Sequence, residues 1–499
     1  MPRPGRSGRI RRSARSLTSS NPESTVGPSR RHTRRIAQAA LGVVVVGGLG
    51  AGGWVYLHHR SGQGVTAQAA ASVATSPPRT VLVPRPCTHV IAGPTDPVVR
   101  SLTASWSAKH PATAITVWRT GTTCPIGIAS QNATVPLLPA SNEKLLTSTG
   151  ALLTLGPAYR FTTRLETADT SNVTQLVGGT LAAPVTLVGS GDPLFATYAY
   201  AHKYLGSNGD TLNALAAHLT KPDGTRPALR KISGALRVNA SVFDGRVVPP
   251  AWSVHDLGSI QPLSGAASNQ DFAGDAQNAT VANPVLATAQ RLKAALRGVH
   301  IATTGAVGSG PVPDAPITLS EVSSPPLTAV LRIMNVPSDD FIAEQLVKAI
   351  GAQARTPGTS THGIARVIAS LRGLGVLEPG DRMVDGSGLA RGDRETSTTL
   401  ALLLLAAQRN PSWGAPLIGS LPSPGQGTLK KRMAGLTARV HAKTGTLNDV
   451  SALSGVVHAA NGKTYTFSIL CNSLAVSQIL AAHNFQDAIV RRLAHGVSG

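Results

Sequence analysis

Two short motifs that lie far apart in the sequence combine residue types suited to acyl transfer through a serine. The first is Ser141-Asn142-Glu143-Lys144, and the second is His441-Ala442-Lys443-Thr444-Gly445-Thr446. Residues three positions apart on a helix share a face, so Ser141 and Lys144 would place a hydroxyl beside an amine. A lysine that is desolvated, or that lies near a second cation such as Lys443, gives up its proton more readily and can accept the serine proton. The motifs therefore predict a nucleophilic serine with a lysine base.

The sequence around the first motif predicts the helix that positions its side chains. Leucines between positions 145 and 155 form an apolar face, and Gly156-Pro157 ends the segment, which indicates a helix over residues 141–155. Ser141 then lies in the first turn, where backbone N–H groups have no partner within the helix. Its N–H is available to a developing oxyanion.

The second motif lies on a predicted strand. Arg439-Val440 leads into Lys443, and an apolar run from Val450 follows the turn Asn448-Asp449, a pattern typical of a hairpin. Lys443 at the edge of this strand is placed to face the start of the helix. Either motif alone is weak evidence, because a serine at a helix start followed by a lysine is usually a cap and a solubilising charge. The combination carries the prediction.

Five segments in order resemble one known family. Leu138–Thr147, which contains the first motif, resembles the nucleophile segment of the D-alanyl-D-alanine carboxypeptidase/endopeptidase family, the class C low-molecular-mass penicillin-binding proteins. The Lys-Thr-Gly of the second motif also matches, and the resemblance spans roughly residues 90 to 495. The remaining matches are a Gly-Gly-Asp-Pro-like turn, an Asp-Gly-Ser-Gly-Leu segment and the approach to the Lys-Thr-Gly strand: Gly189–Pro193, Asp385–Leu389, and Gly427–Leu429 with Arg432-Met433.

This resemblance implies both a reaction and the residues that bind its substrate. It implies a serine D-alanyl-D-alanine carboxypeptidase/endopeptidase that acts on peptidoglycan stem peptides through an acyl-serine, and that β-lactam inhibitors also acylate. Lys443 and Thr444, with Thr446, would bind the terminal carboxylate of the peptide, at a strand that includes Gly445. The N–H of Thr446 would join that of Ser141 in the oxyanion hole.

A third family element is present in altered form. Ser338-Asp339-Asp340 stands where the family has Ser-Asp-Asn, so Asp340 replaces an asparagine. An amide accepts and donates hydrogen bonds, whereas an ionised carboxylate only accepts. Asp340 can hold Lys144 but favours its ammonium form, which opposes a base role and predicts reduced or altered turnover. Ser338 is predicted to relay a proton to the leaving amine; the alternative role is a helix N-cap before Phe341.

Other chemistries have weaker support in this sequence. Ser387 is a rival nucleophile, but Asp385 and Leu389 stand where a Gly-x-Ser-x-Gly motif needs glycines. The 14 histidines include no His-Glu-x-x-His and the three cysteines include no Cys-x-x-Cys. We therefore expect neither a metal nor another cofactor.

The spacing of the motifs predicts an inserted domain. Ser141 and Ser338 are farther apart than a compact serine β-lactamase requires, and the sequence between them contains alternating and β-branched runs. We expect an α+β, penicillin-binding-protein/serine β-lactamase-like fold in which helices flank an antiparallel sheet. The catalytic domain would comprise residues 91–164 and 319–499, and a β-rich insert residues 165–318.

More local patterns predict the ends of the catalytic domain. Thr95-Asp96-Pro97 predicts the start of the first helix of the catalytic domain, because a capping residue precedes a proline in the first turn. A hairpin of Ala114–Trp118 with Ile126–Ile128 follows, and the last helix runs from about Ser477 to Leu493.

The start of the chain predicts a membrane anchor. Ile36–Leu57 contains no charged residue and, at about 1.5 Å per residue, is long enough to cross a bilayer core of about 30 Å. Residues 1–35 are a basic leader that would stay in the cytoplasm, and residues 58–90 a flexible linker to a catalytic domain outside it. The alternative is a cleaved signal and a secreted protein, since Ala67-Gln68-Ala69 resembles a cleavage site.

Composition restricts the partners of the protein. Without the basic leader, which carries +9 of the formal net charge of +22, the exported part has a net charge of +13, which suits an acidic envelope polymer. The content of 4% aromatic residues and an exported location argue against nucleic acid. Cys87 and Cys124 both lie near the start of the exported part and can pair, while Cys471 is expected in a buried strand.

Two other functions stay open from the sequence. A serine β-lactamase uses the same acylating residues, but the long insert and the Asp385–Leu389 segment argue against it. A catalytically weakened protein that binds penicillin or peptidoglycan is the second, and Asp340 is the feature that favours it.

Overall fold

The computed structural model describes most of the chain that follows the linker. The described residues are 90–93, 96–121, 124–168, 176–206, 211–222, 226–252, 261–274, 277–353 and 357–497. Among them, no helix has both the length and the apolar character needed to cross a membrane. Residues 1–89 lie outside the described part of the chain. They include the predicted leader, the predicted anchor Ile36–Leu57 and all but the last residue of the predicted linker.

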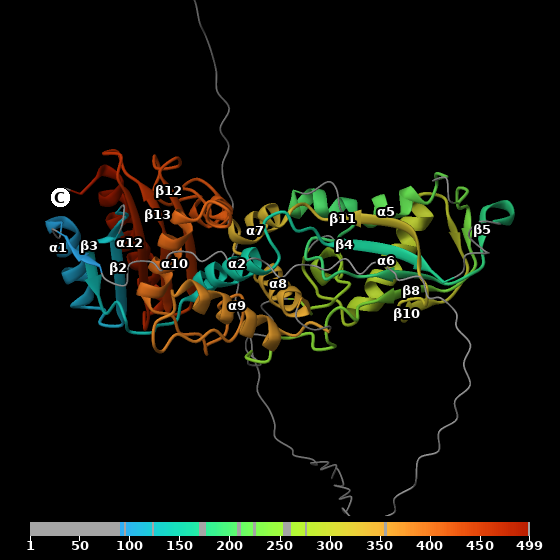
Figure 1. Cartoon of the computed structure of the whole chain (residues 1–499), viewed down its shortest axis with the longest axis horizontal. Coiled ribbons are helices and arrows are strands. Elements are labelled where there is room, and N and C mark those ends of the chain that lie inside the picture. Colours follow the sequence, from blue (N-terminus) through green and yellow to red (C-terminus); the bar gives the residue numbers. More distant parts are fainter. Residues whose placement is uncertain are drawn as a thin grey trace, which may run out of the picture. The chain divides into compact units, whose positions relative to one another are not determined.

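A six-stranded sheet forms one side of the catalytic region (Figure 1). The short strand β1 is parallel to its neighbour, and the other neighbours are antiparallel. Both predicted hairpins are confirmed, and β12, which carries Lys443, is an edge strand of the sheet. In sheet order the strands are β1 (Ile91–Ala92), β3 (Ile126–Gln131), β2 (Thr113–Arg119), β14 (Thr464–Cys471), β13 (Val450–His458) and β12 (Val440–Leu447).

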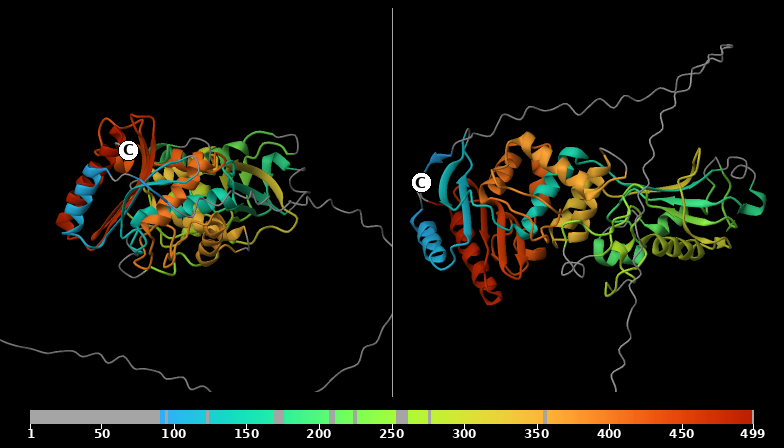
Figure 2. Two further views of the ribbon diagram at one scale, coloured as in Figure 1. Left: turned by 60° about the vertical axis from the view of Figure 1, so that its left-hand side comes forward. Right: turned by 90° about the horizontal axis from the view of Figure 1, so that it is seen from below.

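Helices α1 (Pro97–Ser107) and α12 (Ile479–His495) pack together on one face of this sheet (Figure 2). Asp96 caps α1 by accepting hydrogen bonds from the Val98 and Val99 N–H groups, and it also pairs with Arg492 of α12 at 2.7 Å. The predicted cap at Asp96-Pro97 and the final helix are therefore confirmed. Asp96 ties the first helix of the domain to the last.

The other face of the sheet is covered by a helical layer with α2 (Glu143–Thr154) at its centre. Leu145 and Leu146 are fully buried, as the apolar pattern of this segment predicts. A short 3-10 turn, η1 (Ala140–Asn142), precedes α2 and carries Ser141. The surrounding helices are α7 (Leu327–Asn335), α8 (Asp340–Ala352), α9 (Ser360–Leu374), α10 (Ser397–Arg409) and α11 (Gly414–Ser420).

The region between the motifs has its own core and two smaller sheets. The strands at its entrance and exit, β4 (Thr162–Thr167) and β11 (Ile317–Ser323), pair with each other, so the predicted domain limits fall inside one strand pair and stay predictions. The five-stranded sheet has the order β10 (Val307–Ser309), β8 (Leu236–Asn239), β6 (Val185–Val188), β4, β11, and the three-stranded sheet has β5 (Thr180–Leu181), β7 (Lys231–Ile232), β9 (Ala302–Thr303).

This inserted region also contains helices, which the description as β-rich omitted. α5 (Leu212–His218) and α6 (Pro284–Gly298) pack against each other and share a core with the five-stranded sheet (Figure 1). A short helix, α4 (Tyr198–Tyr200), precedes α5 in the chain. The Asn283 side chain caps α6 and Pro284 occupies its first turn, so the signal for this helix was present in the sequence.

The cysteines differ in state. Cys124 is disulfide-bonded, whereas Cys471 is a free thiol buried at the end of β14, as predicted. Cys87, the predicted partner of Cys124, lies outside the described residues.

Candidate active site

The backbone around Ser141 is held by two glycines from distant segments. Ala140 has a φ of +46°, a left-handed conformation that a non-glycine residue rarely adopts. A Cβ added at Gly445 would lie 2.7 Å from the Pro139 carbonyl and 3.0 Å from the Ser141 nitrogen, and one at Gly388 would collide with the Ala140 carbonyl. The close packing against Gly445 and Gly388 therefore fixes the turn that presents Ser141.

Lys144 contacts Ser141 and two further acceptors. Its Nζ lies 3.0 Å from Ser141 Oγ, 2.5 Å from Asp340 Oδ1 and 2.7 Å from the backbone carbonyl of Ser387. The lysine side chain is fully buried, whereas 24% of the Asp340 side chain is exposed. The predicted Ser141–Lys144 pair is thus formed, and Asp340 contacts Lys144 as the altered third element led us to expect.

Lys443 approaches the same centre from strand β12. Its Nζ lies 2.8 Å from Ser338 Oγ and donates to the Thr444 carbonyl at 2.9 Å. Burial lowers the pKa of Lys443 well below its ordinary value, and the nearby charge of Lys144 lowers it further, while Asp340 opposes both effects. The described residues therefore place two lysines in one buried site, and one of these lysines, Lys144, contacts the carboxylate of Asp340.

Ser338 reaches Lys443 from a strained turn. Its φ is +69°, and α8 begins two residues later with Asp339, not Ser338, as its N-cap. Asp339 Oδ1 accepts the N–H of Ile342 at 2.9 Å. The alternative role of Ser338 as the helix cap is therefore wrong, because the left-handed backbone at Ser338 turns its hydroxyl toward Lys443 and leaves the cap position to the next residue.

The edge of β12 leaves backbone donors available. The N–H of Ala442 points away from β13 and donates to the Pro422 carbonyl at 3.1 Å. Alternate residues of a strand point their N–H groups to the same side, so the N–H groups of Thr444 and Thr446 also face this edge. The Thr444 hydroxyl bonds to Thr428 Oγ1 at 2.7 Å, and Thr446 is exposed. Substrate binding by Thr444, Gly445 and Thr446 stays a prediction.

The Asp385–Leu389 segment supports the site through its backbone. Asp385 Oδ1 accepts the N–H of Gly388 at 2.7 Å, and its Oδ2 accepts the Trp252 ring N–H at 2.9 Å. The Ser387 hydroxyl is fully buried and donates to Asp385 at 3.2 Å. Ser387 is therefore poorly placed as a nucleophile. Its backbone carbonyl accepts a hydrogen bond from Lys144, a role that the sequence motif did not predict.

Gln270 is a residue that the sequence reasoning missed. Its side-chain N–H donates to Asp339 Oδ2 at 2.7 Å, and its carbonyl accepts the Tyr200 hydroxyl at 2.9 Å. Asn269, Gln270 and Asp271 all have positive φ values, between +49° and +55°. Consecutive left-handed residues cost about 1 to 2 kcal/mol each, so other contacts must hold this turn. The inserted region thereby supports the residue that follows Ser338.

Buried carboxyl groups lie on another side of α2. Glu143 is fully buried and Glu395 is 1% exposed. The carboxyl oxygens of Glu143 have no hydrogen-bond partner among the described residues, whereas the carboxyl of Glu395 lies against that of Asp381, with which it can share a proton. Burial, and then the charge of Glu395, raise the pKa of Glu143 well above its ordinary value. Burial, and then the charge of Asp381, raise the pKa of Glu395 well above its ordinary value.

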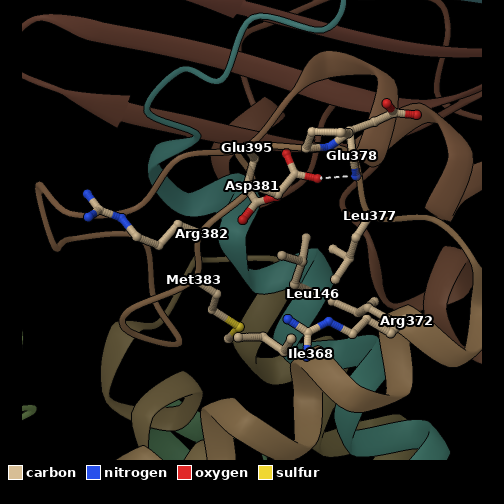
Figure 3. Close-up of a pocket in the computed structure, with 12 residues that line it drawn as sticks. Leu146, Ile368, Arg372, Leu377, Glu378, Asp381, Arg382, Met383 and Glu395 are labelled. Carbon is tan, nitrogen blue, oxygen red and sulfur yellow. Dashed lines mark hydrogen bonds between the residues drawn. The ribbon is translucent and has the colours of Figure 1, made fainter.

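Glu395 and Asp381 line a pocket of about 560 Å³ beside Leu146 of α2 (Figure 3). Ser141, Lys144, Ser338 and Lys443 are not among its lining residues. The part of the chain that the structure describes also contains no group of three or more His, Cys, Asp or Glu side chains arranged to hold a metal ion.

Comparison with known proteins identifies the family. The family model described as D-Ala-D-Ala carboxypeptidase 3 (S13) matches residues 107–270 and 263–495. The chain belongs to this family. The resemblance in the sequence motifs is confirmed, and with it the assignment as a serine-type D-Ala-D-Ala carboxypeptidase at the level of the family.

Individual relatives agree with this assignment. The chain is 30% identical over 375 residues to a carboxypeptidase of Mycobacterium tuberculosis, covering 72% of this chain and 75% of the relative. It is 31% identical over 359 residues to the carboxypeptidase DacB of Mycolicibacterium smegmatis, covering 69% of this chain and 73% of that protein. A D-alanyl-D-alanine carboxypeptidase of an Actinomadura strain is 38% identical over 227 residues, which cover 43% of this chain and 41% of the relative.

A solved structure supports the fold. Penicillin binding protein 4 of Haemophilus influenzae matches with a TM-score of 0.64 at 22% identity, over 79% of this chain and 99% of that one. The coarser part of the predicted fold, a penicillin-binding-protein-like catalytic region of mixed helices and sheets, is confirmed.

Proposed function

We propose that the protein is a serine D-alanyl-D-alanine carboxypeptidase/endopeptidase that acts on peptidoglycan stem peptides and is acylated by β-lactams. The contact of 3.0 Å between Ser141 Oγ and Lys144 Nζ, in a chain of this family, carries the proposal. Ser141 attacks the carbonyl carbon of the penultimate D-alanine, the C–N bond to the terminal residue breaks, and water later hydrolyses the acyl-serine.

Backbone and side-chain groups near Ser141 suit the charges that develop in this reaction. The N–H groups of Ser141 and Thr446 stabilise the oxyanion of the tetrahedral intermediate. Lys443 and Thr444, with Thr446, attract the carboxylate of the peptide. Ser338, at 2.8 Å from Lys443 Nζ, relays a proton to the leaving amine. No step requires a cofactor.

Incubation of the full-length protein with a labelled penicillin and with a peptide ending in D-Ala-D-Ala tests the proposal. We expect covalent labelling of Ser141 and release of D-alanine from the peptide. Rapid hydrolysis of the penicillin with no peptide cleavage would instead identify a β-lactamase. Labelling without any turnover of peptide or drug would identify a catalytically weakened penicillin-binding protein, the alternative that the Lys144–Asp340 contact favours.

We also propose that the protein is a single-pass membrane protein with its catalytic region outside the cytoplasm. The uncharged segment Ile36–Leu57 and the basic residues before it support this location, which is also where peptidoglycan lies. The full-length protein should fractionate with membranes and resist extraction by high salt. A mature N-terminus near Ala70 or Ala71, found by mass spectrometry, would show a cleaved signal and a secreted protein instead.

A further inference from the structure

Positive charge is distributed unevenly along the sequence. Residues 165–318, the predicted insert, contain ten lysines and arginines and ten aspartates and glutamates. Residues 396–499, which include β12 and α12, contain nine lysines and arginines but two carboxylate side chains, Asp449 and Asp487. Each of these two forms an ion pair with an arginine, at 2.5 Å from Arg391 and 2.7 Å from Arg432. The excess of positive charge therefore belongs to the C-terminal part of the catalytic region.

Three of these cations lie on one loop, residues 423–439, which leads into β12. Lys430 and Lys431 are exposed, and Arg439 is partly exposed. None of the three forms an ion pair within the part of the chain that the structure describes. The loop also contains no aspartate or glutamate to neutralise them. Their charges are therefore available to a negatively charged partner.

Two exposed arginines from helices donate hydrogen bonds to this loop. Arg332 on α7 donates to the Gln426 side chain at 3.3 Å, and Arg491 on α12 donates to the Ala434 carbonyl at 3.1 Å. Both acceptors are neutral, so the two guanidinium charges add to those of the loop. We call these five cations the basic surface: Arg332, Lys430, Lys431, Arg439 and Arg491.

The basic surface adjoins the proposed substrate site. The Thr428 N–H donates to the carbonyl of Val336, which lies two residues before Ser338, at 3.1 Å. The Thr428 hydroxyl accepts a hydrogen bond from that of Thr444 on β12 at 2.7 Å. Lys430 follows Thr428 by two residues. The basic surface therefore begins beside the strand that is proposed to bind the peptide carboxylate.

We propose that the basic surface binds a phosphodiester polymer of the cell envelope and thereby holds the enzyme next to its peptide substrate. Guanidinium groups match the paired oxygens of a phosphate, and lysines add point charges, so a chain of phosphodiesters can contact several of the five cations. The position beside the active site favours a wall polymer over an anionic membrane, because a membrane on this surface would shield the site from peptidoglycan. The inference goes beyond the proposed function, and its binding tests require no peptidase reaction.

Binding of a defined polymer tests the proposal directly. Fluorescently labelled poly(glycerol phosphate) would be titrated with full-length protein in a neutral detergent, and its anisotropy would be followed at several salt concentrations. The loop variant combines Lys430→Gln, Lys431→Gln and Arg439→Gln, which lie outside the proposed catalytic and substrate-binding residues. It should bind about tenfold to a hundredfold more weakly than the parent and depend less on salt, because fewer counterions are displaced. Its penicillin labelling should equal that of the parent, and labelled dextran, a neutral polymer, should bind to neither protein.

The matched control removes three exposed cations from the insert: Arg230→Gln, Lys293→Gln and Arg297→Gln. This variant has the same net charge as the loop variant. Its affinity for the polymer should stay within about twofold of the parent value, because salt screens charges that are distant from the binding surface. Equal losses of affinity in the two variants would show that the polymer responds to net charge alone. That result, or an unchanged affinity of the loop variant, would overturn the proposal.

Competition with other anions tests the chemistry of the partner. Phosphatidylglycerol mixed into the detergent micelles is the probe for a membrane surface, and poly-glutamate is the probe for a carboxylate polymer. We expect both to displace the labelled polymer less effectively than unlabelled poly(glycerol phosphate) does at the same concentration of negative charge. More effective displacement by the lipid would identify a membrane contact. Equal displacement by poly-glutamate would show no preference for phosphate, and either result would contradict the proposal.

Peptidoglycan fragments with and without an attached phosphodiester polymer connect binding with the proposed function. The parent should release D-alanine from the polymer-bearing fragments with a KM about tenfold lower and an unchanged kcat, because the bound polymer raises the local concentration of substrate. The loop variant should show the same KM for both fragments. If the parent also shows one KM for both, the proposal fails. If neither fragment releases D-alanine, the peptidase assignment fails, and the result of the binding titration still stands.

Discussion

Two groups of like charges lie on different sides of helix α2. On one side, Lys144 and Lys443 have hydrogen-bond partners for their amines, and Asp340 supplies an opposite charge. On the other side, the carboxyl oxygens of Glu143 have no partner among the described residues, and the carboxyl of Glu395 lies against that of Asp381. Adjacent residues of a helix point about 100° apart, so the sequence Glu143-Lys144 sends one side chain to each group.

The comparison shows what makes a buried pair of like charges reactive. Burial and mutual repulsion favour the neutral form in both groups, lowering the pKa of Lys443 and raising that of Glu143. On the lysine side, the hydroxyls of Ser141 and Ser338 contact the two amines. The carboxyl groups have no described contact with either hydroxyl, so we expect them to influence stability more than catalysis.

Removal of the nucleophile gives the largest expected effect and tests which side of α2 performs the chemistry. Ser141→Ala should reduce covalent penicillin labelling below detection, because no oxygen is left for the acyl bond. Its thermal stability should stay nearly unchanged, because the hydroxyl makes one partly exposed contact. Mass spectrometry of labelled peptides and a melting curve measure both. The exposed Ser412→Ala is the control, and labelling that persists in Ser141→Ala would move the nucleophile to Ser338 or Ser387.

The carboxyl side should show its effect in the pH dependence of stability. Raised folded-state pKa values mean that the native state binds more protons than the unfolded state above pH 4.5, the ordinary value for glutamate. The stability that these groups contribute is therefore fully present at lower pH and is lost as pH rises through the folded pKa values. Glu344, whose pKa burial raises to about 8, contributes in the same direction.

Glu143→Gln isolates this contribution, since an amide of the same shape cannot ionise. At pH 5 the variant should be no more stable than the parent, because the amide also has no partners. At pH 9 it should be more stable by about 3 to 5 kcal/mol, the cost of an uncompensated buried charge. Urea unfolding at both values measures the difference. The exposed Glu321→Gln should leave the pH dependence unchanged. Parallel curves for Glu143→Gln and the parent would show that folding does not raise the pKa of Glu143.

Removing the carboxylate of Asp340 would leave the Lys144–Lys443 pair without an opposite charge, as the Glu143–Glu395 pair is. Asp340→Asn takes away the carboxylate at 2.5 Å from Lys144 Nζ, and with it a charge that opposes the lowering of the Lys443 pKa. Acylation at neutral pH should rise about tenfold to a hundredfold, or about 1.4 to 3 kcal/mol, and the pH profile should shift toward acid. Stopped-flow acylation against pH measures this. Asp314→Asn, at an exposed position, is the control. Identical profiles for Asp340→Asn and the parent would mean that Asp340 does not influence the base.

Local patterns were sufficient for most of the catalytic elements. The apolar face after Ser141 and the hairpin around Lys443 determine α2 and β12, and the order of the motifs brings Ser338 to the same centre. The contact between Lys144 and Asp340 followed from matching Ser338-Asp339-Asp340 to its family counterpart. These predictions succeed because each depends on a short segment or on motif order.

The remaining features depend on contacts between distant segments. Whether Ser338 or Asp339 caps α8 is decided by the left-handed φ of Ser338, and a short polar sequence permits either. The proximity of Glu143 to Glu395 has no signature in either local sequence. Gln270 lies on a turn of three left-handed residues, so its contact with Asp339 depends on how the insert folds and not on a local sequence pattern.

Substitution of Gln270 has the smallest expected effect. It tests whether the inserted region helps to position Ser338 beside Lys443. Gln270→Ala removes the 2.7 Å hydrogen bond to Asp339 Oδ2, while the cap bond from Ile342 to Asp339 remains. The turn that carries Ser338 loses one support. A single hydrogen bond contributes about 0.5 to 1.5 kcal/mol, so the acylation rate should fall about twofold to tenfold. Tyr200→Phe, which leaves the Gln270 amide in place, should have a smaller effect.

Gln270→Gly separates positioning from backbone strain. Glycine adopts the φ of +49° at this position at a lower energetic cost than alanine does, so the glycine variant should be more stable than the alanine variant by about 1 kcal/mol. Both variants lack the same hydrogen bond, and both should therefore acylate equally slowly. Melting curves and acylation rates measured side by side decide the matter. If acylation recovers in Gln270→Gly along with stability, strain in the turn and not the bond to Asp339 controls the site, and the link from the insert to Ser338 has no part in catalysis.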